Sequence, residues 1–88
     1  MALSSGKTTV TTAGTRVVLA ATASVNSGVV IKALHGNTGI IYVGNSTVAS
    51  TNGLQLYANE AITVITASLA NVYIDSSVNG EGVTWLAS

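Results

Sequence analysis

The residues that could carry out chemistry in this chain are one histidine, His35, and three acids, Glu60, Asp75 and Glu81. A catalytic histidine needs a nucleophile and an orienting acid, but no acid lies within twenty positions of His35. Paired carboxylates would have to flank a substrate at about 5 to 9 Å, and these three acids are scattered along the chain. We therefore expect each acid to solvate a turn or an edge strand, and we expect that the protein is not an enzyme.

Metal, phosphate and cofactor sites also lack their usual residue patterns. There is no cysteine, which excludes disulfides, thiolate zinc sites and a thiol nucleophile. Calcium takes about six to eight oxygen ligands, and Asp75 followed by two serines is too small a set. The segment Gly36-Asn37-Thr38-Gly39 lacks the Gly-Lys-Ser/Thr ending of a phosphate-binding loop. The sequence therefore predicts no catalytic, metal-binding or cofactor-binding residue.

Four aromatic side chains remain as candidates: Tyr42, Tyr57, Tyr73 and Trp85. All four fall in segments that we expect to be strands, so we expect them to pack in the core or at an interface. Trp85 is the expected core anchor, with an interface role as the alternative. Carbohydrate binding would need aromatics exposed together beside polar groups, and burial of Tyr42, Tyr57 and Trp85 would argue against it.

The composition of the 88 residues excludes several classes of partner. Three Lys and Arg balance three Asp and Glu, and charged residues are 7% of the chain, where about 25% is typical. So few cations cannot hold a nucleic-acid backbone or an anionic membrane surface. The longest unbroken apolar run, residues 17–21, is far shorter than the roughly 20 residues of a membrane-spanning helix. With no signal-like segment at the start, we expect a soluble protein kept in the cytoplasm where it is made.

The content of Val (12), Ile (6) and Thr (12) favours strands over helices. Short apolar runs end at Gly, Asn or Ser clusters, which is typical of an all-β domain with tight turns. We predict one compact antiparallel β-sandwich, or a small barrel, over residues 7–88, after a flexible N-terminal segment at residues 1–6. A loop is expected at residues 23–28. The seven to eight short strands are expected at residues 7–12, 16–21, 29–34, 40–43, 54–57, 61–66, 71–76 and 83–87.

The most specific local prediction is a hairpin near the C-terminus. Asn79-Gly80 lies between two apolar runs, and Asn-Gly in that position is a strong signal for a hairpin turn. We therefore expect residues 71–76 to pair with residues 83–87. Gly80 should adopt a positive φ, which glycine accepts because it has no Cβ.

Several predicted strands carry apolar residues on both faces. The pairs are Val29/Val30, Ile40/Ile41 and Ile62/Ile65. An isolated sandwich buries one face of each sheet and presents polar residues on the other. A chain this short, without disulfides, metal ligands or helices, has few ways to shield a second apolar face. Another subunit would supply the cover, so we expect a homotrimer or another small homo-oligomer.

Six segments of the chain resemble small all-β bacteriophage virion proteins. They are residues 8–19, 29–34, 37–44, 52–56, 71–75 and 80–83, and they include the motifs Asn37-Thr38-Gly39, Ile41-Tyr42-Val43-Gly44 and Asn52-Gly53-Leu54. These motifs are similar to those of head-decoration (cement) proteins and of the capsid-anchoring modules of head fibres. The likeness extends over residues 7–86. Ala58-Asn59 stands where such modules often have Pro-Gly.

The resemblance implies a structural virion protein that binds the major capsid protein on the outer capsid surface and stabilises the head as a decoration or cement protein. It would assemble with copies of itself in the host cytoplasm, and it has no catalytic residues to carry over. A head-fibre base, or a tail or baseplate component, is the alternative within the virion. A carbohydrate-binding module for host adsorption is the alternative from another class. Neither nucleic acid nor membrane is an expected partner.

Overall fold

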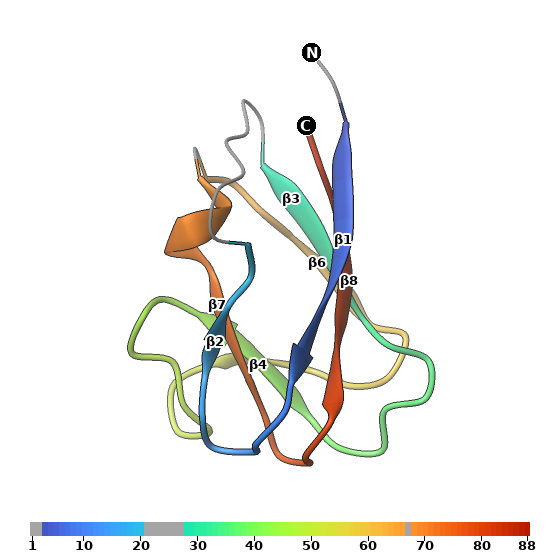
Figure 1. Ribbon diagram of the computed structural model, residues 1–88, viewed down its shortest axis with the longest axis vertical. Coiled ribbons are helices and arrows are strands. Elements are labelled where there is room, and N and C mark those ends of the chain that lie inside the picture. Colours follow the sequence, from blue (N-terminus) through green and yellow to red (C-terminus); the bar gives the residue numbers. More distant parts are fainter. Residues whose placement is uncertain (1–2, 21–27, 67) are drawn as a thin grey trace.

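Two four-stranded antiparallel β-sheets form the protein, whose computed structural model describes residues 3–20, 28–66 and 68–88 (Figure 1). The strands are β1 (Ser4–Val10), β2 (Val17–Val18), β3 (Val29–Ala33), β4 (Ile41–Gly44), β5 (Leu54–Leu56), β6 (Ala61–Val64), β7 (Tyr73–Ser76) and β8 (Glu81–Ala87). One short 3₁₀-helix, η1 (Leu69–Asn71), precedes β7. The predicted all-β sandwich is confirmed.

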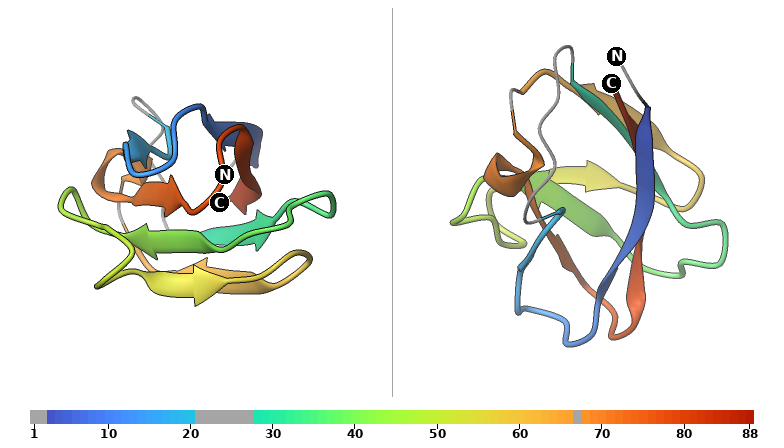
Figure 2. Two further views of the ribbon diagram at one scale, coloured as in Figure 1. Left: turned by 90° about the horizontal axis from the view of Figure 1, so that it is seen from below. Right: turned by 45° about the horizontal axis from the view of Figure 1, so that its top comes forward.

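The strand order is β1-β8-β3-β6 in the first sheet and β2-β7-β4-β5 in the second. The sheets face each other, and the left view of Figure 2 shows them as two columns side by side. Apart from the β4–β5 connection, consecutive strands lie in opposite sheets. The chain therefore crosses from sheet to sheet at almost every connection. This arrangement of eight strands is that of a jelly roll, a sandwich built from two Greek keys.

Alternation along each strand sends apolar side chains into the space between the sheets. In β3, for example, Val29, Ile31 and Ala33 are buried while Val30 and Lys32 are exposed. Both sheets contribute to the core, together with residues from the connections. Its buried members are Val10, Leu19, Val29, Ile31, Ala33, Ile41, Val43, Leu56, Leu69, Val72, Ile74, Val83 and Ala87. Full burial of one such Val, Ile or Leu side chain contributes about 1.5 to 3 kcal/mol.

The predicted hairpin near the C-terminus is wrong. β7 pairs with β2 and β4 in the second sheet, whereas β8 pairs with β1 and β3 in the first. The turn at Asn79-Gly80 therefore carries the chain between sheets and is fastened to the β1–β2 connection. The Gly80 N–H donates to the Val10 carbonyl at 2.8 Å, and the Ala13 N–H donates to Asn79 Oδ1 at 2.7 Å. The expected positive φ at Gly80 is confirmed, at 80°.

Strand boundaries near the N-terminus also differ from the prediction. β1 begins at Ser4 because residues 4–6, expected to be flexible, pair with the end of β8. β2 is limited to Val17–Val18, within the predicted 16–21, and pairs with β7 alone. Residues 1 and 2, residue 21 and nearly all of the loop expected at 23–28 lie outside the described residues.

Replacing Gly80 with alanine should lower the free energy of unfolding by about 1 kcal/mol, because a Cβ disfavours the left-handed conformation found there. A Cβ at Gly80 would meet no atom within 4 Å, so the cost comes from the backbone alone. Gly36→Ala is the matched control, because its Cβ is equally free and its φ is not in the left-handed region. Thermal unfolding compares the two variants, and a Gly80→Ala protein that melts with the parent would contradict this conformation.

Candidate functional site

Glu81 fastens the β3–β4 connection to the start of β8. Its carboxylate accepts from the Thr38 N–H at 2.6 Å, the Thr38 hydroxyl at 2.9 Å and the Gly39 N–H at 2.9 Å. The Thr38 N–H is the largest influence and lowers the pKa of Glu81 below its ordinary value of 4.5, against an opposing effect of desolvation. This is a more specific role than the solvated turn position expected from the sequence.

Asp75 and Glu60 also accept hydrogen bonds from backbone N–H groups of the connections. Asp75 lies in β7 with only 3% of its surface exposed, and its Oδ1 accepts from the Gly14 N–H at 3.0 Å and the Ser76 N–H at 2.7 Å. Glu60 accepts from the Tyr57 N–H at 2.7 Å within the turn between β5 and β6. Burial of a carboxylate is costly unless it is hydrogen-bonded, so the two donors to Asp75 explain how β7 tolerates it.

His35 is exposed in the β3–β4 connection, the same connection that Glu81 binds through Thr38 and Gly39. Its Nδ1 lies 3.1 Å from the side-chain nitrogen of Asn59, which joins this connection to the β5–β6 turn. Within residues 3–20, 28–66 and 68–88, no three His, Asp or Glu side chains form a group that could hold a metal ion. The same part of the chain has no helix of the length and apolarity needed to cross a membrane.

Tyr42 and Tyr73 both lie on the outer face of the second sheet, and Tyr73 is half-buried there, but the four aromatic side chains are not exposed together. Tyr42 is buried on the outer face of the second sheet, Tyr57 is 54% exposed after β5, and Trp85 is half-buried on the inner face of the first sheet. Trp85 packs over Gly6, where a Cβ would come within 2.6 Å of Cζ2, and its Nε1–H donates to the Thr8 hydroxyl at 3.3 Å. Trp85 therefore flanks the core beside β1, and the shared aromatic platform that carbohydrate binding would need is not formed by these residues.

The outer face of β4, in the second sheet, is covered by the chain's own loop, residues 45–53, between β4 and β5. Val48 in this loop is 1% exposed, and it approaches Gly44 and Gly53 so closely that a Cβ on either would come 2.9 Å from its Cγ2. Tyr42 beneath it is 6% exposed. For this face of β4, the cover that we expected from a second subunit comes from within the chain.

The outer face of the first sheet has no such cover among the described residues. Val30 on β3 and Leu86 on β8 are cross-strand partners, 42% and 48% exposed. In the next row Lys7 and Lys32 flank Thr84 from β1 and β3. We call this surface the open face. Its exposed residues are Ser5, Lys7, Thr9, Val30, Lys32, Ala61, Thr63, Thr84 and Leu86.

The sequence analysis identified Val30 as a possible contact residue, because Val29 and Val30 place apolar side chains on both faces of one strand. It did not identify Leu86, Lys7 or Lys32 as members of the same surface. The period-two alternation of a strand over residues 81–87 would have placed Leu86 on the face of the sheet opposite to that of Trp85. The alternation does not reveal that β8 lies between β1 and β3, which is what brings Leu86, Val30 and the lysines onto one surface.

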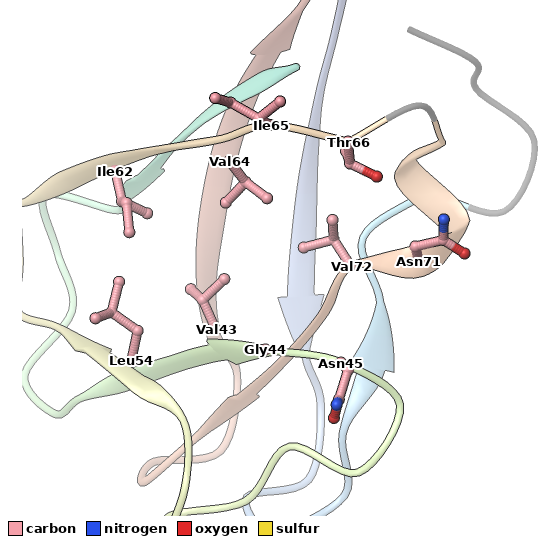
Figure 3. Close-up of a pocket in the computed structure, with 10 residues that line it drawn as sticks. All are labelled: Val43, Gly44, Asn45, Leu54, Ile62, Val64, Ile65, Thr66, Asn71 and Val72. Atoms are coloured by element: carbon pink, nitrogen blue, oxygen red, sulfur yellow. The ribbon is translucent and has the colours of Figure 1, made fainter. Parts of the chain in front are cut away.

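A groove opens between the two sheets along the edge where β5 and β6 lie (Figure 3). We call it the edge groove, and its volume is about 330 Å³. Leu54 and Ile62 point toward each other across it, and Ile65 at its rim is 87% exposed. The lining residues are Val43, Gly44, Asn45, Leu54, Ile62, Val64, Ile65, Thr66, Asn71 and Val72, none of which is charged.

Comparisons with family models, with curated proteins and with solved structures give no match to this chain. The described side chains offer two surfaces suited to association, the open face and the edge groove. Both combine exposed apolar residues with neighbouring hydroxyl or amide groups, which is the chemistry of binding a protein surface.

Replacing Glu81 with glutamine should lower the free energy of unfolding at neutral pH by about 1 kcal/mol, because an amide cannot accept all three hydrogen bonds. The pKa of Glu81 is lowered in the fold, so its contribution is complete above the unfolded value and is lost as the pH falls through the lower folded value. The deficit of Glu81→Gln should therefore shrink below pH 4.5.

Chemical denaturation of the parent and the variant across this pH range measures that deficit. Glu60→Gln is the control, because it removes the same charge from a carboxylate with one loop donor, Tyr57. A Glu81→Gln deficit that stays constant down to the most acidic pH would contradict the assigned role.

Proposed function

We propose that this protein is a structural component of a bacteriophage particle, which binds the outer surface of the capsid shell as a decoration or cement protein. The observation that carries the proposal is the open face, where Val30 and Leu86 remain exposed although the outer face of β4 in the other sheet is covered by the chain's own loop. A contiguous exposed apolar surface on a small domain indicates a binding partner. The resemblance of the chain to small phage virion proteins names the partner, the major capsid protein.

The fold supports the proposal by analogy. Jelly rolls occur in virus capsid proteins, and also in lectins and cupins, so the fold narrows the function without fixing it. Two of the six segments that resemble virion proteins, residues 37–44 and 71–75, contain β4 and most of β7, which are neighbours in the second sheet. The resemblance therefore involves paired strands of the fold, and among the functions of jelly rolls it favours a virion role.

The proposed mechanism is mechanical. Each molecule, alone or within a small homo-oligomer, contacts neighbouring capsid subunits and adds a modest free energy of association. Many such contacts on one particle combine through multivalency, so that separating the subunits requires several contacts to open together. The small number of charges suits this role, because the apolar part of a contact surface avoids the cost of burying unpaired charge.

Particles assembled without this protein should open at a lower temperature than complete particles, and adding the purified protein back should restore the difference. Complete particles should carry on the order of hundreds of copies, since stabilisation by many weak contacts requires high occupancy of the shell. Quantitative protein analysis of purified particles and a thermal release assay for the genome check both statements. A handful of copies per particle would indicate a head-fibre base or a tail component, and complete absence from particles would refute the proposal.

A further inference from the structure

The charges of this neutral chain are separated in space. Two of the three cations, Lys7 and Lys32, project from the open face, while the three acids are engaged with loops. None of the exposed residues that define the open face is acidic. The face is therefore a positive, partly apolar surface on a molecule with no net charge.

We infer that the open face is the surface that docks on the capsid, and that its partner is an acidic patch with an apolar centre. This inference rests on the proposed function and adds the contact face and the chemistry of the partner. Carboxylates on the capsid would meet the Lys7 and Lys32 ammonium groups, while an apolar side chain would cover Val30 and Leu86. Opposite charges at the rim of an apolar contact set its orientation and speed the encounter.

The strand register fixes the spacing of these groups. Lys7, Thr84 and Lys32 stand in one row across β1, β8 and β3, so the two lysines are two strand spacings apart, about 10 Å. In the adjacent row, Leu86 and Val30 are direct partners on β8 and β3. A complementary surface needs two carboxylates about 10 Å apart, beside an apolar residue.

A second copy of this chain is a poorer occupant of the open face. In a two-fold contact the same patch meets itself, so four lysines and no acid would be brought together. Like charges placed opposite each other at an interface cost free energy. The edge groove is uncharged and carries no such restriction, so contacts between copies are better placed there.

The size of the open face implies a weak individual contact. Its four strands have seven, seven, five and four residues, and at about 3.4 Å by 4.8 Å per residue they give a flat face of roughly 400 Å². Stable pairwise interfaces bury roughly 800 Å² on each partner. One molecule should therefore bind reversibly, and tight attachment requires several open faces joined in one oligomer.

The test is binding of purified variants to capsids assembled without this protein, measured by co-sedimentation. Leu86→Ser should weaken binding about tenfold, as loss of a central apolar contact does. Val78→Ser is the control, because Val78 is also an exposed apolar residue, with 37% of its surface exposed, but it lies in the β7–β8 connection, outside the open face and the edge groove. It should leave the affinity of a single molecule within about twofold, and thermal unfolding of both variants verifies that the fold is intact.

The charge contribution is tested with Lys7→Gln/Lys32→Gln. Binding of the parent should fall about severalfold between roughly 0.05 and 0.5 M salt, and the double variant should bind weakly with little salt dependence. The third cation, Arg16, is left unchanged in this test, because it donates to the Ser46 carbonyl and lies away from the open face. Unchanged binding and unchanged salt dependence in the double variant would overturn the acidic-partner inference.

The remaining outcomes separate the two proposals. If Leu54→Ser, a change in the edge groove, weakens capsid binding and Leu86→Ser does not, the edge groove is the contact, and the inference fails while the proposed function stands. If Leu86→Ser converts an oligomer of the parent to monomers in sedimentation equilibrium, the open face joins copies, and the inference again fails. If the parent does not bind capsids, the proposed function itself is refuted.

Discussion

The structure depends on side-chain acceptors that fasten the connections between the two sheets. Because almost every connection crosses between sheets, its backbone N–H groups leave the strand ladders and need other partners. Glu81 and Asp75 supply these partners for the β3–β4 and β1–β2 connections, and Asn79 supplies another for the latter. The three acids of this chain thus accept hydrogen bonds from backbone N–H groups of the connections. That use leaves the lysines of the open face without acidic neighbours on their own surface.

The sequence was sufficient for the class of fold and for the position of most strands. Clear alternation, as at residues 29–33, together with Gly and Asn clusters, identifies strands because each residue's facing depends only on its neighbours. Strand pairing was not accessible, because it depends on contacts between residues distant in sequence. The Asn79-Gly80 sequence predicts the backbone conformation of the turn correctly. The same turn, however, can join two paired strands of a hairpin or carry the chain from one sheet to the other. Here the turn crosses between the sheets, and the Gly80 N–H donates to the Val10 carbonyl.

The two outer faces show why the candidate surfaces were only partly predictable. Apolar residues on both sides of β3 and β4 gave one expectation, cover by another subunit. In β4 the cover is Val48 from the chain's own 45–53 loop, while Val30 in β3 remains exposed. A similar lesson comes from Asn59, in the turn between β5 and β6. Its φ of 68° shows that the position requires a left-handed residue, and asparagine tolerates that conformation better than most.

The packing of Trp85 over Gly6 has a practical consequence. Trp85 is the only tryptophan of the chain, and its indole contacts β1, an edge strand of the first sheet, through Gly6 and the Thr8 hydroxyl. Indole emission responds to the polarity around the ring, so detachment of β1 changes the fluorescence while the remaining strands stay paired. The intrinsic fluorescence of Trp85 should therefore report local separation of β1 from the first sheet, in addition to global unfolding.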